Sequence, residues 1–113
     1  MKNLVYKLFI VFFTFSVFLS CSNNKKSPEE ITIGISLGPM HERWEKDRDF
    51  LKEKLEAKGA KVIIKEANND EAVQKEQFLD LIKSGVDVII VTALNSDAAG
   101  ALVQVAKKND VDV

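Results

Sequence analysis

The stretch Val86–Ala93, VDVIIVTA, decides the fold of this chain. Its apolar residues run almost continuously, which is typical of a strand that is buried on both faces of a sheet. Gly85 stands directly before it as the end of one helix, and Asn95 follows it as a possible start of another. A buried strand between two helices indicates a parallel sheet, and we expect this strand to be central in it.

Two pairs of strand and helix precede this stretch. The apolar runs Ile31–Leu37 and Lys61–Ala67 predict strands, and the charged, periodic segments at about 41–58 and 71–84 predict helices. Gly59 follows the first of these helices as a C-terminal cap. Strands and helices that alternate at this spacing predict right-handed βαβ units in a parallel sheet.

A third helix and the beginning of a fourth strand follow. Asn95 and its two neighbours offer N-caps, and Lys107-Lys108 supplies the positive charge that suits a helix C-terminus. The run Val111–Val113 looks like the start of a strand. We therefore predict an α/β fold, a parallel three-layer sandwich in the order 2-1-3, with strand 4 beside strand 3. Because the sequence stops inside an apolar strand, we interpret it as part of a longer protein.

The first thirty residues have the pattern of an exported lipoprotein. Two lysines precede the apolar run LFIVFFTFSVFL, residues 8–19, which is short for a membrane span and has the length of a signal peptide. Ser20-Cys21 then resembles the bacterial lipoprotein signal. We expect residues 1–20 to be removed, Cys21 to carry lipid, and residues 21–30 to be a flexible tether. The alternative for Cys21 is an unpaired residue of a cleaved leader.

Composition and motifs argue against several classes of function. The 113 residues carry a net charge of −1, with lysines spread along the sequence, so we expect no nucleic-acid binding. His41 is the only histidine and Cys21 the only cysteine, which is too few for a His/Cys metal site or a catalytic triad. Gly34 and Gly38 lack the third glycine of a dinucleotide site, and Pro39 removes an amide that phosphate would need. We expect no enzyme activity and no cofactor.

The charged run Met40–Arg48, MHERWEKDR, holds the only Trp of the chain. It begins the first helix, so Trp44 falls at the carboxyl edge of the sheet, where ligands bind in open α/β folds. Sugar sites combine an aromatic face with planar hydrogen-bonding groups. Arg43 stands next to Trp44 and Glu42 precedes both, which indicates a site for recognition without chemistry.

These residues also carry a resemblance to a known family. From Ile31 to Val113 the chain resembles the first lobe of the periplasmic sugar-binding proteins of ABC importers, and most of all their D-xylose-binding branch. That branch carries E-R-W-x-x-D-R after its first strand, similar to Glu42–Arg48. It also carries an A-N-x-(D/E)-E turn, similar to Ala67–Glu71, and a G-V-D-V strand, similar to Gly85–Val88.

The resemblance implies a type I periplasmic binding protein, of which residues 31–113 form part of the N-terminal lobe. The second lobe is absent from the sequence, and a half site should bind sugar weakly or not at all. The full-length protein would be a monomeric lipoprotein in the periplasm or on the extracytoplasmic face of a membrane, anchored through Cys21. It would deliver a monosaccharide, D-xylose before others, to an ABC permease of the inner membrane.

The resemblance also implies roles for single residues, each with an alternative. Arg43 would hydrogen-bond the pentose, or be a solvated charge. Trp44 would stack on the ring, or be a core residue on the apolar stripe of its helix. Glu42 would accept from the sugar, or pair with Lys46 one turn on. Asn95 would lie at the rim of the site, or cap its helix.

Two alternatives stand for the whole protein. One is a receptor of the same fold that reports another small ligand, such as a quorum-signalling furanose, to a chemotaxis or quorum sensor. The other is an exported enzyme of flavodoxin-like architecture, which would need a phosphate-binding first loop that Gly38-Pro39 does not supply.

Overall fold

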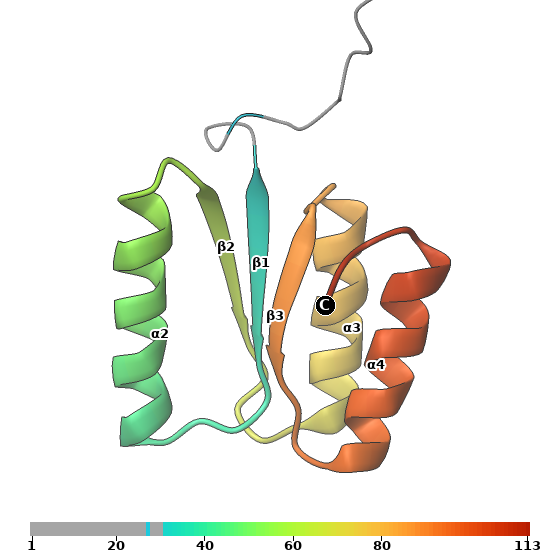
Figure 1. Cartoon of the computed structure of the whole chain (residues 1–113). Coiled ribbons are helices and arrows are strands. Elements are labelled where there is room, and N and C mark those ends of the chain that lie inside the picture. The colour runs from blue at the N-terminus through green and yellow to red at the C-terminus, as the bar shows by residue number, and fades with distance from the viewer. Residues whose placement is uncertain (1–26, 28–30) are drawn as a thin grey trace, which may run out of the picture.

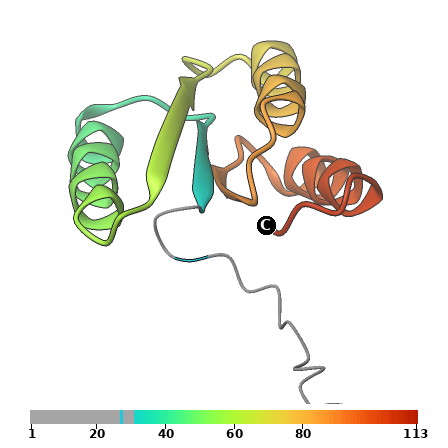
Figure 2. The same ribbon diagram turned by 90° about the horizontal axis from the view of Figure 1, so that it is seen from above.

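Three parallel strands and three helices form the described part of the chain in the computed structural model, which covers Ser27 and residues 31–113. The elements are β1 (Thr32–Leu37), α2 (Glu42–Glu56), β2 (Lys61–Glu66), α3 (Glu71–Lys83), β3 (Val88–Thr92) and α4 (Ser96–Lys108). The sheet has the order β2-β1-β3 with parallel neighbours, and α2 covers one face while α3 and α4 cover the other (Figures 1 and 2). The predicted three-layer α/β sandwich and its strand order are confirmed.

The predicted start of a fourth strand lies where we expected it. Val88 and Asp112 form a parallel bridge, and the Ile89 amide donates to the Asp112 carbonyl at 2.8 Å. Strand 4 therefore begins beside β3. The predicted signal peptide and Cys21 lie outside the described residues, as does all of the predicted tether except Ser27.

The core lies mainly between the sheet and the layer of α3 and α4. Its buried residues are Phe78, Leu81, Val86, Ile89, Leu102, Ala106 and Val111. Side chains of β1 alternate between the two faces, and Gly34 lies against Leu81 of α3. Ile33, Ile35 and Leu37 therefore face the side of α2, and all three are buried.

The prediction that β3 is an inner strand agrees with its two neighbours, β1 on one side and the bridge to Asp112 on the other. The prediction that β3 is buried on both faces is wrong, since four of its five residues are only half-buried. The reason is the position of α2, which lies beside β2 at the far edge of the sheet from β3 (Figures 1 and 2). On the face of the sheet where α2 lies, no helix among the described residues covers β3.

Two glycines end helices α2 and α3, and one carboxylate joins the starts of two strands. Gly59 and Gly85 adopt φ of 89° and 75° directly after α2 and α3, a conformation that glycine reaches without a Cβ penalty. At the amino edge of the sheet, Asp87 accepts from the Thr32 amide through Oδ2 and donates its own amide to the Thr32 carbonyl, both at 2.8 Å. Asp87 thus fastens the start of β3 to the start of β1.

Within residues 31–113 no helix is long and apolar enough to cross a membrane.

Candidate functional site

The segments that follow the three strands meet at the carboxyl edge of the sheet, the lower edge in Figure 1. The Gly38 amide donates to the carbonyl of Thr92 at the end of β3, and the Asn69 amide donates to the Gly38 carbonyl, each at 2.8 Å. The Met40 amide also contacts Asn69 Oδ1 at 3.4 Å. The three segments therefore form one hydrogen-bonded unit with the segment after β1 in its middle.

Two consecutive asparagines allow this arrangement. Asn68 and Asn69 adopt φ of 50° and 67°, the left-handed region that asparagine tolerates better than most residues. Asp70 then caps α3, since its Oδ1 accepts from the Val73 amide at 3.0 Å. The A-N-N-D turn of the sequence is thus a structural device that turns the chain into α3 and supports the neighbouring segment.

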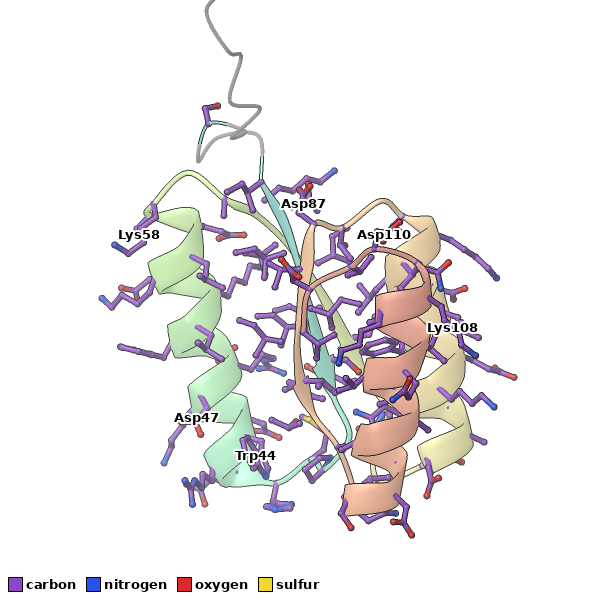
Figure 3. The ribbon with its side chains drawn as sticks, turned by 45° about the vertical axis from the view of Figure 1, so that its right-hand side comes forward. Trp44, Asp47, Lys58, Asp87, Lys108 and Asp110 are labelled. Carbon is purple, nitrogen blue, oxygen red and sulfur yellow. The ribbon has the colours of Figure 1, made fainter. Side chains whose placement is uncertain are left out.

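The site prediction rests first on Arg43 and Trp44, which the structure brings together. Trp44 lies in the first turn of α2, at the carboxyl edge, and is half-buried (Figure 3). The Arg43 guanidinium carbon lies 5.7 Å from the centroid of the Trp44 ring, within the range of a cation–π contact. Arg43 also lies 3.8 Å from Asp47, and its side chain is 80% exposed. An aromatic surface and an exposed guanidinium therefore stand side by side.

The other two predicted ligand residues have partners within the chain. Glu42 Oε1 accepts from Lys46 Nζ at 2.9 Å, and both side chains are exposed. Asn95 caps α4, since its Oδ1 accepts from the Ala98 amide at 2.8 Å, and its Nδ2 donates to Glu71 at 3.1 Å. Both residues lie at the carboxyl edge, and a role in ligand contact remains a prediction for each.

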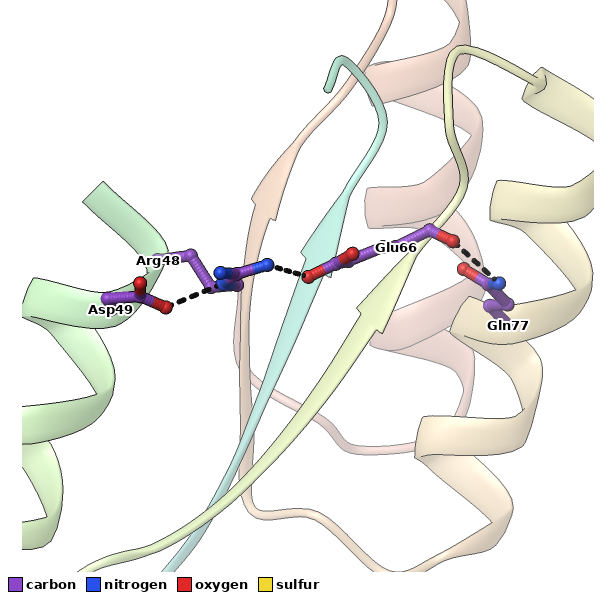
Figure 4. A network of polar contacts seen from close by, with 4 residues as sticks. All are labelled: Arg48, Asp49, Glu66 and Gln77. Atoms are coloured by element: carbon purple, nitrogen blue, oxygen red, sulfur yellow. Dashed lines mark hydrogen bonds and ion pairs between the residues drawn. The ribbon is translucent and has the colours of Figure 1, made fainter. Parts of the chain in front are cut away.

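Arg48 lies in the matched motif and was expected to be a scaffold residue and not a ligand contact, but the sequence pattern did not reveal its partner. It fills the position on the inner stripe of α2 between Trp44 and Leu51, is half-buried, and donates to Glu66 at the end of β2 at 2.5 Å (Figure 4). Its Nε donates to Asp49 at 2.7 Å. These hydrogen bonds, to Asp49 first and then to Glu66, raise the pKa of Arg48 above its usual range, and Arg48 lowers the pKa of Asp49.

Gln77 binds the same residue at a different group. Its Nε2 donates to the backbone carbonyl of Glu66 at 3.0 Å and so ties the end of β2 to α3, while the Glu66 carboxylate pairs with Arg48 (Figure 4). Because α2 lacks fully buried residues, the ion pair of Arg48 with Glu66 contributes to the orientation of the helix that carries Trp44 and Arg43. One feature of the sequence could have indicated that Arg48 faces inward. The apolar stripe skips from Trp44 to Leu51, and Arg48 fills the position between them.

Two hollows lie away from Arg43 and Trp44. One is a mostly apolar groove of about 300 Å³ between α3 and α4, and the other is a shallow hollow of about 490 Å³ beside Arg48 and Lys52. A site that closes between two lobes has only one wall in a single lobe, so an open carboxyl edge is compatible with the prediction. The described residues also contain no group of three or more His, Cys, Asp or Glu side chains placed to hold a metal ion.

Comparison with known proteins gives consistent results. The family model described as "Periplasmic binding protein domain" matches residues 33–113. The chain is 33% identical over 104 residues to the D-xylose-binding periplasmic protein of Escherichia coli (strain K12), covering 91% of this chain and 32% of that protein. It is also 33% identical over 95 residues to the ribose import binding protein of Bacillus subtilis (strain 168), covering 83% of this chain and 30% of that protein.

Solved structures agree with these relatives. A carbohydrate transporter solute binding protein from Chloroflexus aurantiacus, in complex with D-glucose, matches with a TM-score of 0.65 and 32% identity. The match covers 72% of this chain and 24% of that one. The chain thus spans about a third of the length of the curated relatives, 32% in the case of the Escherichia coli protein.

Proposed function

Because the chain belongs to the periplasmic binding protein domain family, we propose that it forms part of the N-terminal lobe of a receptor that binds a monosaccharide for an ABC importer. D-xylose is the first candidate sugar, since the name of the Escherichia coli relative, 33% identical, states that ligand. A second lobe would close over the carboxyl edge and complete the site. The protein then acts by binding and delivery and not as an enzyme.

One observation supports this proposal above the others, the pairing of Arg43 with Trp44 at the carboxyl edge. An exposed guanidinium offers up to five donors to sugar hydroxyls, and an indole ring offers a flat apolar surface to the C–H face of a pyranose. The two residues are consecutive on α2, and only near the start of a helix can both reach past the edge of the sheet. In this proposal Glu42 and Asn95 contribute from the rim.

The test uses a second aromatic and cation pair on the same helix as its control. Phe50 and Lys54 also form a cation–π contact, at 5.3 Å, but lie further along α2. In the full-length protein, Arg43→Ala should weaken D-xylose binding by roughly 2–4 kcal/mol, as for a truncated charged hydrogen bond that is buried on closure. Trp44→Ala should weaken binding as well, whereas Phe50→Ala and Lys54→Ala should leave it unchanged.

Calorimetric titration with D-xylose, D-ribose and D-glucose measures these affinities, and a melting curve of each variant measures stability. If Arg43→Ala and Trp44→Ala bind pentose as the wild type does, the assignment of the site fails. If Trp44→Ala loses only thermal stability, Trp44 belongs to the packing of α2 against the sheet. If the wild type binds none of the three sugars, the proposed ligand class fails.

The proposal extends to location and partners. Residues 1–20 would be removed as a signal peptide, Cys21 would carry lipid, and residues 21–30 would tether the lobe to the outer surface of the membrane, close to an ABC permease. Labelling cells with a radioactive fatty acid tests the anchor. Label that persists in a Cys21→Ala variant would contradict lipidation at this residue. The full-length protein would act as a monomer.

A further inference from the structure

Gln74 is a buried polar residue near the carboxyl edge of the sheet, on the face that α3 covers. It belongs to the first half of α3 and is 1% exposed. Its Nε2 donates to the carbonyl of Thr92 at 3.0 Å and to Ser36 Oγ at 3.3 Å, and Ser36 is itself fully buried. One amide therefore reaches from α3 to the ends of both β1 and β3.

The Thr92 carbonyl joins this amide to the segment after β1. It accepts from the Gly38 amide at 2.8 Å as well as from Gln74, so two donors converge on one carbonyl oxygen. Gly38 also fits closely over the Gln74 amide. A Cβ at position 38 would stand 2.7 Å from Gln74 Oε1 and 3.0 Å from its Nε2. Gln74 and Gly38 thus define each other's positions.

A buried glutamine in this place needs a reason other than stability. Its Oε1 has no hydrogen-bond partner among the described residues, and an unsatisfied buried acceptor costs about 1–3 kcal/mol. A leucine would fill the space without that cost but could not donate to Thr92. Polar residues in an otherwise apolar core tend to occur where geometry matters for function.

We propose that Gln74 is a positioning residue for the sugar site, which holds the segment 38–41 at the end of β3 and so places Arg43 and Trp44. The expected effect of Gln74 on sugar binding rests on the proposed function. The placement of Trp44 can be measured without any sugar. The segment from Gly38 leads directly into α2, whose first turn contains both side chains.

Trp44 is the only Trp of the chain and reports on its own surroundings. Gln74→Met keeps the size of the side chain but removes both hydrogen bonds. Gln77→Met is the matched control, because Gln77 lies one turn on in α3, carries the same amide, and bonds to the end of β2 instead. Circular dichroism at low temperature first shows that both variants are folded. Fluorescence then measures the emission maximum of Trp44 and its quenching by acrylamide.

We expect Gln74→Met to shift Trp44 emission to longer wavelength and to increase its quenching, while Gln77→Met matches the wild type. No change in Gln74→Met, or equal changes in both variants, would overturn the proposal. In the full-length protein the affinity for D-xylose should fall about tenfold in Gln74→Met, which corresponds to one lost hydrogen bond. If the wild type binds no sugar while Trp44 still responds to Gln74→Met, the proposed function fails and the positioning role stands.

A second variant serves if Gln74→Met does not fold. Gln74→Glu can donate to the Thr92 carbonyl only while its carboxyl group is protonated, and burial favours that form. Its Trp44 emission should equal that of the wild type at low pH and depart from it as the pH rises. Emission identical to the wild type at every pH would contradict a role for the donated hydrogen bond.

Discussion

Replacing Gly38 with alanine should destabilise the domain strongly although only one methyl group is added. The new Cβ would lie 2.8 Å from the Thr92 carbonyl oxygen and 2.7 Å from Gln74 Oε1. The glutamine amide could turn away, but the carbonyl belongs to the backbone of β3 and cannot move without pulling the strand. The Gly38 amide bonds to the same carbonyl, so any shift that relieves the contact also lengthens that hydrogen bond.

The magnitude follows from these two effects. Overpacking a tight site costs about 1–3 kcal/mol, and weakening a backbone hydrogen bond adds about 1 kcal/mol. The free energy of unfolding should therefore fall by roughly 2–4 kcal/mol. For a domain of this size each kcal/mol lowers Tm by about 4–8 °C, so Tm should fall by roughly 8–32 °C.

Gly100→Ala is the control. Gly100 lies on the exposed side of α4, and a Cβ there would meet nothing within 4 Å. Alanine should stabilise the helix at this position by about 0.5–1 kcal/mol. Thermal and urea denaturation followed by circular dichroism measure both variants. If Gly38→Ala melts within a few degrees of the wild type, the segment after β1 is not held as described.

Three further predictions concern single polar contacts. Asp87→Ala should lower the free energy of unfolding by about 1–3 kcal/mol in urea denaturation, because the Thr32 amide loses its carboxylate acceptor; an unchanged midpoint would contradict this. Asn95→Ala should cost about 1 kcal/mol through loss of the α4 cap, whereas Asn95→Asp should keep most of the stability, and equal losses would argue against capping. Arg48 lowers the pKa of Asp49, so their pair stabilises the fold above the ordinary carboxyl pKa and is lost as the pH falls through the lowered pKa; melting curves of Asp49→Asn should show less loss of stability on acidification than the wild type.

The fold was predictable because local signals and periodicity agreed. The glycines after two helices, the cap at Asn95, and three apolar runs at regular spacing all indicated one parallel sheet. The burial of β3 was not predictable, because an apolar run shows that a strand can be covered and not which helix covers it. In the described part of the chain α2 lies at the edge beside β2. The position of a helix on a sheet depends on tertiary packing.

The positions of Arg43 and Trp44 at the carboxyl edge were predictable, whereas the residues that support them were not. Trp44 and Arg43 follow from the sequence, since both stand at the start of a helix after the first strand. Gln74 was missed because glutamine in a helix is usually solvated, although it lies four residues before buried Phe78 on the same face. Gly38 was considered for a phosphate-binding loop. Its close contact with Gln74 joins residues far apart in the sequence, so no local pattern indicates it.

The lack of any buried residue in α2 has a consequence for the local stability of the molecule. A helix attached by a half-buried stripe and one ion pair should open at a lower free energy than α3 or α4, so its amide protons should exchange with solvent through partial unfolding. In the proposed function this least anchored helix carries the residues that meet the sugar. A ligand at a hundred times its Kd would add about 2.7 kcal/mol to the free energy of opening of α2 if it binds only while α2 is folded. Amide exchange in α2 would then follow the concentration of sugar, while exchange in the α3–α4 layer would respond much less.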